Sequence, residues 1–396
     1  MADAARDTLI TGVGIVSCLG EGPDAHWQAL MTQPPRPDTT TYAPFIVHPI
    51  VPLNLDAQIP KRGDQRQMEP WQRIGTYAAG LALDSAGIKG NTDLLQRTDM
   101  IVAAGAGERD LMVDAAILSG LPKAPSPEAF LNERLMNDLR PTLFLAQLSN
   151  LLAGNISIVH GVTGSSRTFM GEEAAGIDAV RVACARIAAG QSDIALVGGS
   201  HNGERKDLLM LYEFGGFELK DKFAPVWERA AHRGFALGSL GAFLVLESRQ
   251  HAEARGAKPT ARLTAVASSR GRRVAGGVGE SLQRLFATVA PGLDTSEAAA
   301  ISGATGVETA TSEERDFYAT LPGLAVRATG TQIGHGFEPQ FAMNIALAAL
   351  AVERGTLFAP CGDTPVETPM SGPLRHAIVT GVGHWRGEGM ALVEGV

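Results

Sequence analysis

The centre of the chain holds residues whose types and spacing are suited to chemistry. An apolar run at residues 155–161 predicts a strand, and a turn leads from it into a helix whose first turn contains Glu172 and Glu173. Gly176 and Ala179 follow on this helix and allow another element to pack closely. The free N–H groups at a helix start favour an anion or a developing negative charge. The junction therefore predicts a crevice that stabilises a reacting group.

A glycine motif, Gly12-x-Gly14-x-x-Ser17, follows an apolar run near the start of the chain. In dinucleotide-binding proteins, glycines at such positions let the backbone approach a pyrophosphate at the start of a helix. Here the third position is Ser17, and residues 18–22 interrupt any helix that would follow. We therefore interpret the motif as a plain turn at the end of a strand and expect no cofactor.

The elements that position these residues are predicted by apolar runs bounded by glycine, which are typical of buried strands. These runs are residues 9–16, 100–104, 156–159, 194–197, 243–247, 299–302 and 377–379. Segments with helical periodicity lie between them, at residues 71–86, 174–189 and 341–354. Strands that alternate with helices indicate an α/β architecture with largely parallel sheets inside the molecule.

Two short stretches nearly repeat each other at the two ends of the chain. They read Leu9-Ile10-Thr11-Gly12-Val13-Gly14 and Ile378-Val379-Thr380-Gly381-Val382-Gly383. Two similar halves would place both stretches in equivalent strands. Residues 34–75, which are rich in proline, and residues 107–140, which include helical pieces, are interpreted as long excursions over the surface. Neither excursion resembles a flexible linker between domains, so we expect the two halves to pack closely against each other.

The composition narrows the classes of function. The chain has 396 residues, a formal net charge of −8 and only 19% charged residues. This balance argues against nucleic acid as the main partner, because phosphate binding needs a clustered basic surface. The first eight residues lack the pattern of a signal peptide. The apolar, uncharged stretches at residues 234–246 and 341–352 are too short to span a membrane. We therefore expect a cytoplasmic protein without membrane insertion.

The cysteines carry no pattern that indicates a metal or a disulfide. Cys18, Cys184 and Cys361 are odd in number and far apart, so neither a disulfide framework nor a Cys-x-x-Cys metal site can be drawn. We expect a reducing compartment and no metal.

Further motifs follow one another through the rest of the chain. They are Trp27, Asn150-Leu151-Leu152-Ala153-Gly154-Asn155-Ile156-Ser157, Asp193-Ile194-Ala195-Leu196-Val197-Gly198-Gly199, Arg233-Gly234-Phe235-Ala236-Leu237-Gly238, Leu244-Val245-Leu246-Glu247, His251-Ala252-Glu253-Ala254-Arg255-Gly256-Ala257 and Gly334-His335. In this order they resemble the β-ketoacyl-acyl-carrier-protein synthases of the thiolase superfamily. The resemblance extends from the first predicted strand to nearly the last residue. It implies a thiolase-like, five-layered αβαβα fold, with one half at residues 1–254 and the other at residues 255–396.

The resemblance also locates an active site, most of whose residues differ from those of the family. In the family a Cys at a helix start takes the acyl chain as a thioester, two His stabilise the enolate formed when a malonyl group loses CO2, and a Lys supports the site. Here Glu173 stands at the nucleophile position, Ala304 at the first His position and Gly330 at the Lys position. His335, at the second His position, is retained. A carboxylate cannot form the normal acyl thioester, and an alanine offers no hydrogen bond to an enolate.

Substrate-binding residues follow from the same resemblance. In the family a Gly-Phe-Gly-Gly-Thr-Asn run supplies a gate for the acyl pocket and an oxyanion N–H. The corresponding residues here, 381–386, read Gly-Val-Gly-His-Trp-Arg, so that Val382 takes the place of the gate and Gly381 precedes it. Phe337 lies after His335, where the family has small residues. We expect Val382, Phe337 and Gly381 to contact substrate.

Simpler interpretations of several residues stay open. Glu173 is also explained as an acid that is stabilised by the dipole of its helix, and His335 as a structural relic. His384 or His201 could supply a missing function from another loop. Cys184 is best explained as a buried, apolar thiol.

Taken together, these features predict a non-condensing member of the family, comparable to the chain-length-factor subunits that pair with an active, Cys-containing ketosynthase. Such a subunit would help to build a fatty acid or polyketide on an acyl carrier protein. The alternative is an active 3-oxoacyl synthase (an acyltransferase) or malonyl decarboxylase with a rearranged site, working as a homodimer. A third interpretation is a small-molecule-binding protein. We expect at least a dimer, either homodimer or heterodimer, formed by pairing of residues 155–159 as a strand across a two-fold axis.

Overall fold

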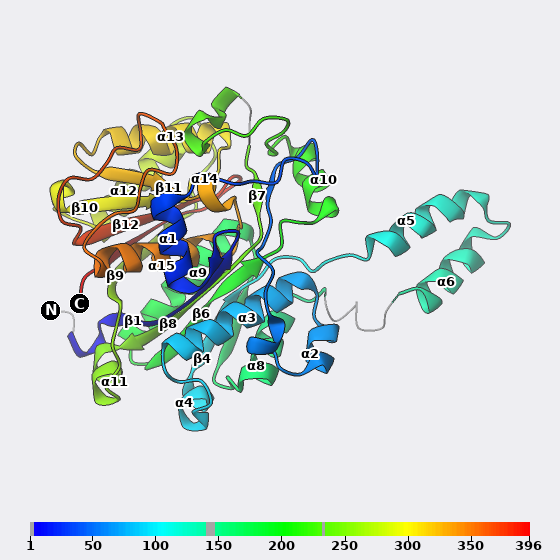
Figure 1. The fold of residues 1–396 in the computed structure, drawn as a ribbon, viewed down its shortest axis with the longest axis horizontal. Coiled ribbons are helices and arrows are strands. Elements are labelled where there is room, and N and C mark those ends of the chain that lie inside the picture. Colours follow the sequence, from blue (N-terminus) through cyan, green and yellow to red (C-terminus); the bar gives the residue numbers. More distant parts are fainter. Residues whose placement is uncertain (1–3, 140–146, 232–233) are drawn as a thin grey trace.

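The computed structural model describes residues 4–139, 147–231 and 234–396 of the chain (Figure 1). Arg140, the last residue of one predicted excursion, and Arg233, the first residue of one of the motifs, lie outside the described residues.

Eleven strands of the described chain form one mixed sheet. Their order is β11-β10-β12-β13-β9-β1-β8-β6-β4-β5, with the short β2 paired to β1, and a separate small sheet pairs β3 with β7. The strands are β1 Thr8–Ser17, β2 Gly20–Glu21, β3 Val47–His48, β4 Asp99–Ala103, β5 Ser166–Phe169, β6 Ile194–His201, β7 Leu237–Gly238, β8 Leu240–Ser248, β9 Ala261–Ser269, β10 Ala298–Ser302, β11 Ala325–Ala328, β12 His376–Val382 and β13 Glu388–Glu394.

The large sheet consists of two halves with the same strand order and directions. In one half β4 is parallel to β5 and β6, and β8 is antiparallel to β6 and β1. In the other half β10 is parallel to β11 and β12, and β13 is antiparallel to β12 and β9. Antiparallel pairing of β1 with β9 joins the halves. The expected two repeated halves are therefore confirmed, and the predicted division after residue 254 lies between β8 and β9.

Helices of the described chain form three layers around the two halves of the sheet (Figure 1). The central layer is α9 and α15, which contact each other and strands of both halves. Helices α3 and α8 cover the first half, and α12 and α13 cover the second. This is the expected five-layered αβαβα order. The helices are α1 Gly22–Thr32, α2 Arg62–Gln67, α3 Pro70–Ser85, α4 Thr92–Arg97, α5 Leu111–Gly120, α6 Pro127–Asn137, α8 Leu151–His160, α9 Glu172–Ala188, α10 Lys206–Gly215, α11 Arg249–Ala254, α12 Gly277–Val289, α13 Glu308–Ala319, α14 Gly330–Ile333 and α15 Gln340–Glu353.

The composition of α15 explains why it occupies the centre. All of its residues from Gln340 to Val352 are buried, and most of them are apolar. A helix that is hydrophobic on all sides is stable only where other elements surround it. Within the described residues, no helix combines the length and apolar character that crossing a membrane requires.

The near-repeat at the two ends of the chain does not correspond to the structural repeat. Leu9 lies in β1 and Ile378 lies in β12. By their places in the two halves, β1 corresponds to β9, whereas β12 corresponds to β6. The prediction that these stretches occupy equivalent strands is wrong. Both are buried strands in which glycine permits close packing, and this shared requirement accounts for their similarity.

Gly12 and Gly14 lie inside β1, so the predicted turn at this motif is also wrong. A Cβ atom on Gly14 would lie 2.1 Å from the carbonyl oxygen of Ala78, and one on Gly12 would lie 2.5 Å from that of Ala82. Both carbonyls belong to α3, so a side chain at either position would push the helix away from the strand. The glycines of this motif therefore allow α3 to pack closely against β1.

Six of the seven predicted strands and all three predicted helices are present, with shifted bounds. The exception is residues 156–159, which belong to α8. Leu152, Ile156 and His160 are buried at helical spacing, whereas Ile158 is 71% exposed, a pattern that a buried strand cannot give. Residues 155–159 therefore cannot pair as a strand across a two-fold axis. The strand at this edge of the sheet is β5.

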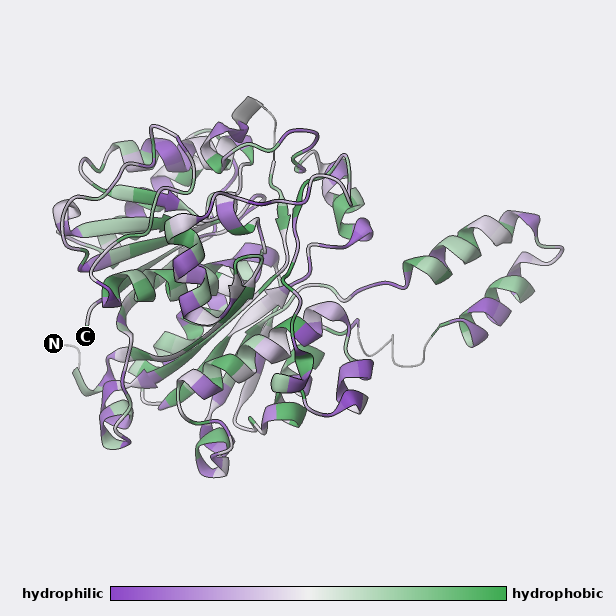
Figure 2. Cartoon of the chain, in the orientation of Figure 1, coloured by the Kyte–Doolittle hydropathy of each residue, from purple (hydrophilic) through white to green (hydrophobic). Residues whose placement is uncertain are grey.

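The excursion predicted at residues 107–140 contains a two-helix arm, α5 and α6, which projects from the body of the molecule (Figure 1). Helix α5 is largely hydrophobic (Figure 2), yet Ile117 is its single buried residue. Met112 is 81% and Leu118 is 72% exposed. Contiguous exposed apolar side chains mark an interaction surface.

Candidate functional site

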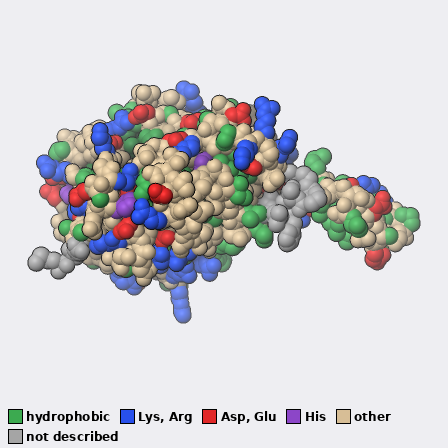
Figure 3. Space-filling model, turned by 90° about the horizontal axis from the view of Figure 1, so that it is seen from below, with side chains coloured by type: hydrophobic (Ala, Val, Ile, Leu, Met, Phe, Trp, Pro, Cys, Tyr) green, Lys and Arg blue, Asp and Glu red, His purple; other side chains and the backbone are tan. Residues whose placement is uncertain are grey.

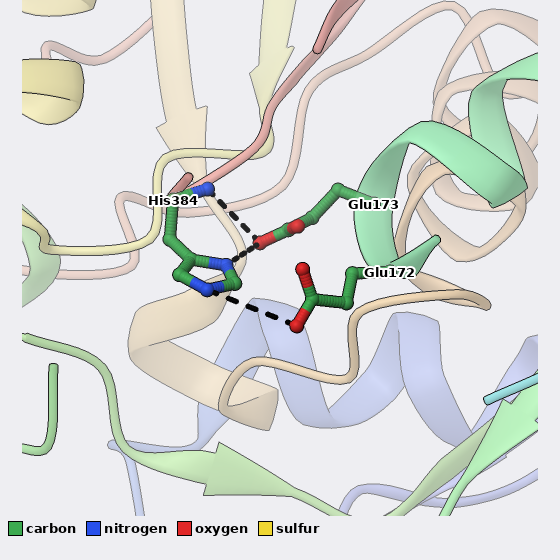
Figure 4. Close-up of side chains that lie close together, drawn as sticks. All are labelled: Glu172, Glu173 and His384. Atoms are coloured by element: carbon green, nitrogen blue, oxygen red, sulfur yellow. Dashed lines mark hydrogen bonds and ion pairs between the residues drawn. The ribbon is translucent and has the colours of Figure 1, made fainter. Parts of the chain in front are cut away.

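The junction between β5 and α9 is strained. After β5 ends at Phe169, Gly171 adopts a φ of 133° and Glu172 a φ of 57° before the helix continues. A non-glycine residue in the left-handed region costs on the order of 1–2 kcal/mol, and such strain clusters at functional sites. The turn directs Glu172 and Glu173 toward the same loop (Figure 4).

Glu173 is the centre of a buried polar cluster. Its Oε1 lies 2.8 Å from His335 Nε2 and 2.9 Å from His384 Nδ1, and it accepts a third hydrogen bond, 3.2 Å long, from the backbone N–H of His384. Figure 4 shows the two contacts with His384. All three side chains are buried. One carboxylate oxygen therefore ties together the start of α9, the loop that follows α14 and the loop that follows β12.

The charges of this cluster follow from its contacts. Burial alone would raise the pKa of Glu173, but the charge of His384 and the hydrogen bonds from His335 and His384 outweigh it and lower the pKa. Burial alone would lower the pKa of His384, yet the carboxylates of Glu173 and Glu172 raise it. For His335, burial prevails and lowers the pKa. The cluster is thus an ion pair between Glu173 and the His384 imidazolium, with a neutral His335 that donates its Nε2–H.

Aromatic rings hold the two imidazoles in place. Phe337, with a φ of 51°, stacks on Tyr212 at a centroid distance of 4.8 Å and meets His335 edge-on at 4.5 Å. Phe235 lies 5.2 Å from His335 and 5.4 Å from His384. Phe337 is only 1% exposed, so it forms a wall of the Glu173 cluster, and its contact with substrate stays a prediction.

A cavity of about 210 Å³ adjoins the cluster at Glu172. Its wall combines apolar side chains, such as Trp71, Leu208 and Leu211, with polar ones, among them Glu172, His201, Asn202, Arg205, Tyr212 and Glu338. The Tyr212 hydroxyl donates to Glu172 Oε1 at 3.1 Å. His201, which the sequence analysis named as an alternative, lies here, with its Nδ1 3.8 Å from Glu338 Oε2.

The other two substituted positions are adjacent to each other and carry no polar side chain. A Cβ atom on Gly330 would lie 3.3 Å from the carbonyl oxygen of Ala304. The fully buried guanidinium of Arg229 donates to the carbonyl oxygens of Ala224, Thr305 and Gly330 at 2.9, 3.5 and 3.3 Å. Burial lowers the pKa of Arg229 to about 9. A buried cation therefore lies beside Gly330, the position predicted for the family's Lys, but its hydrogen bonds go to the backbone.

Val382 and Gly381 lie in β12, within the core. Val382 is 1% exposed and belongs to the same hydrophobic cluster as Ala304. A Cβ atom on Gly381 would lie 2.9 Å from a methyl carbon of Ile177. Their predicted contact with an acyl chain remains untested.

The structure gives a place in the site to two residues that the sequence analysis did not select. His384 was named only as an alternative, although it follows Gly383 directly after a strand, in the loop that the resemblance assigns to the oxyanion N–H. Glu172 was not selected, although it stands beside Glu173 in the first turn of the same helix. Cys184 packs against the core, as an apolar thiol would, but it is only partly buried rather than buried.

The comparisons with solved structures identify the fold. The ishigamide ketosynthase/chain length factor superposes with a TM-score of 0.79 at 20% identity, covering 99% of both chains. A β-ketoacyl synthase from Burkholderia phymatum STM815 also gives a TM-score of 0.79, at 18% identity, over 98% of this chain and 99% of its own. The fold is therefore that of the thiolase-like ketosynthases.

The comparisons with known sequences identify the family. The chain is 24% identical to 3-oxoacyl-[acyl-carrier-protein] synthase 2 of Vibrio cholerae over 266 residues, which are 64% of this chain and 60% of the relative. It is 26% identical to the tetracenomycin polyketide synthase ketoacyl synthase beta subunit of Streptomyces glaucescens over 270 residues, 64% of this chain and 61% of the relative. These matches span about three fifths of each relative. The family model for the N-terminal domain of β-ketoacyl synthases matches residues 5–252, and the chain therefore belongs to the β-ketoacyl synthase family.

Proposed function

We propose that this chain is a non-condensing subunit that pairs with a Cys-containing ketosynthase in fatty acid or polyketide biosynthesis. The observation that carries the proposal is the state of Glu173. Its carboxylate occupies the family's nucleophile position and is engaged by His335 and His384. No thioester can form on it, and its negative charge disfavours an enolate next to it.

The remaining substitutions support the same role. With Ala304 and Gly330 at the other two positions, the site lacks an enolate hydrogen bond and the family's Lys. The relatives named as a ketoacyl synthase beta subunit and as a ketosynthase/chain length factor support the pairing. A neighbouring structure, a type II polyketide acyl carrier protein in complex with its ketosynthase, supports an acyl carrier protein as the further partner.

A surface suited to the partner lies at the β5 edge of the sheet. β5 is the terminal strand, so among the described residues no strand pairs with one side of its backbone. Ile158 on the adjoining α8 is 71% exposed, Met170 after β5 is 66% exposed, and the apolar arm is nearby in the sequence. Figure 3 shows hydrophobic side chains on the arm and on the side of the body that faces it. We propose that a ketosynthase, or a second copy of this chain, covers this surface.

Co-expression with a Cys-containing ketosynthase from the same genome tests this function. We expect a stable complex of the two chains, with condensation of acyl and malonyl groups on an acyl carrier protein in the complex. Replacing the partner's Cys should abolish condensation, whereas Glu173→Gln in this chain should leave most of it. A chain that copurifies with no ketosynthase, or whose Glu173→Gln variant abolishes condensation in an intact complex, contradicts the proposal.

One observation favours a second candidate, a malonyl decarboxylase. His335 and His384 both reach the nucleophile position, so that two imidazoles are present although Ala304 has replaced the first family His. Imidazole N–H groups stabilise the enolate that loss of CO2 leaves. Release of CO2 from malonyl-carrier protein by the purified chain alone, lost in His335→Ala, would support this candidate over the first.

A further inference from the structure

Negative charge accumulates at the edge of the Glu173 cluster. Glu172 and Glu173 are adjacent at the start of α9, and Glu338, in the loop after α14, lines the same cavity as Glu172. Glu338 is only 4% exposed. Carboxylates held close together favour a bound cation.

The donor atoms lie at distances suited to one ion. One oxygen of Glu172, one oxygen of Glu173 and one nitrogen of His384 all lie within 4.8 Å of one another. His384 Nε2 is 3.9 Å from Glu172 Oε1, too far for a hydrogen bond. Two ligands at ~2.1 Å from one ion are roughly 3–4 Å apart. The separation is therefore that of two ligands of a shared metal (Figure 4).

The hydrogen bonds orient the imidazole for this purpose. All three hydrogen bonds to Glu173 go to Oε1, and the one from the His384 ring involves Nδ1. A carboxylate on one ring nitrogen orients a metal-bound histidine and leaves the other nitrogen to the metal. The ion takes the place of the Nε2 proton of the His384 imidazolium, which is released to solvent. In His384 that other nitrogen, Nε2, faces Glu172 (Figure 4).

A second, independent observation comes from the adjoining cavity. His201 and Glu338 line it together with Glu172. His201 is 8% exposed, and its Nε2 has no hydrogen-bond partner within the described residues. A buried polar atom without a partner indicates a missing water, ion or ligand. The cavity has room for the waters that would complete a coordination shell.

From these observations we propose that Glu172, Glu173 and His384 bind one divalent transition-metal ion, with its open positions toward the cavity beside His201. The imidazole ligand favours Zn²⁺, Ni²⁺ or Co²⁺ over Mg²⁺ or Ca²⁺. The site requires no partner subunit and is therefore independent of the proposed function.

Metal titration of the purified full chain tests the site. The chain is treated with EDTA, dialysed into metal-free buffer and titrated with ZnCl2 by calorimetry, and with CoCl2 by visible absorption. We expect one ion per chain for both metals. Glu172→Gln should weaken binding at least about tenfold and remove the Co²⁺ ligand-field bands. The Glu172 side chain is 39% exposed, so this change should leave the fold intact, as circular dichroism would verify.

His376→Gln is the matched control. His376 pairs with Glu394 on β12–β13, outside the cluster. The His376→Gln variant should therefore bind metal like the wild type. The proposal is wrong if metal binding does not saturate at one ion per chain. It is also wrong if Glu172→Gln and His376→Gln weaken binding equally. Neither result bears on whether the chain pairs with a ketosynthase.

Discussion

His384 Nδ1 lies 2.9 Å from Glu173 Oε1, although 211 residues separate the two in the sequence. The contact links the family's nucleophile position to the loop after β12. An acid at the position predicted for the nucleophile and an imidazole in the loop after β12 therefore form one interaction. Removing either partner would leave the other buried without its counter-charge, which is costly. The site is thus rebuilt around a carboxylate.

The packing behind Glu173 gives a first prediction. Gly176→Ala on α9 should lower the free energy of unfolding by about 1–3 kcal/mol, because a Cβ atom there would lie 2.2 Å from the carbonyl oxygen of Glu338. Urea denaturation measures the change. Gly154→Ala on α8 is the control: its Cβ meets nothing closer than 3.6 Å, so it should stabilise the chain by up to about 1 kcal/mol. Equal effects of the two substitutions would contradict this account.

Strands and helices were predictable where burial imposes a clear pattern. The near-continuous apolar character of α15 and of the central strands follows from being covered on both sides. Residues 156–159 were predicted wrongly because a short apolar run fits either a strand or a buried helix face. The exposure of Ile158 distinguishes a strand from a helix here, and this exposure depends on the tertiary structure.

The site was predictable in part. Glu173 and His335 follow from motifs that keep their order along the chain. His384 could not be selected, because its role depends on how the loop after β12 turns back onto α9. The strained φ of Glu172 and the partnerless Nε2 of His201 are likewise consequences of the folded arrangement.

A second prediction concerns pH and the join between the halves. Glu247, fully buried at the end of β8, accepts hydrogen bonds from Arg255, His251 and Thr11. Burial alone would raise its pKa, but these hydrogen bonds lower it to about 2. A depressed carboxyl pKa stabilises the fold above the unfolded value of about 4.3, and this stabilisation is lost as the pH falls toward 2.

Glu247→Gln should therefore destabilise the chain by roughly 3–5 kcal/mol at pH 7. The difference from wild type should shrink as the pH falls below about 4.3. Denaturation at pH 7, 5 and 3.5 measures it. Glu253→Gln, at a 67% exposed side chain 3.8 Å from Arg249, is the control and should change stability by less than about 1 kcal/mol at each pH. A difference between Glu247→Gln and wild type that does not vary with pH would exclude this role.

A third prediction tests the partner surface. Ile158→Asp should weaken the complex with a ketosynthase at least about tenfold, because it places a charge within an apolar contact. The melting temperature of the isolated chain should hardly change, since the side chain is 71% exposed. Size-exclusion chromatography with light scattering provides the measurement. Val274→Asp, at a 59% exposed position before α12, should leave the complex intact. If Val274→Asp is the more disruptive change, the surface lies elsewhere.

The last prediction concerns catalysis by the chain alone. Purified wild type supplied with acyl- and malonyl-carrier protein should not condense them, because Glu173 prevents covalent capture and Ala304 removes a hydrogen bond worth ~10²–10³ in rate. Glu173→Cys alone should not rescue the reaction, since residues that act as a unit are far from additive.

The variant with Glu173→Cys, Ala304→His and Gly330→Lys is the comparison. A Cβ atom at position 330 would lie 3.2 Å from a side-chain carbon of Val226, so the new lysine has little room. Its charge would also lie near that of the buried Arg229. We therefore expect more turnover than from Glu173→Cys alone, yet well below ordinary enzyme rates. Radiolabelled malonyl-carrier protein gives the readout. Turnover by the wild type at ~1 per second or faster, with no ketosynthase detectable by mass spectrometry, would refute the non-condensing role and establish a rearranged catalytic site.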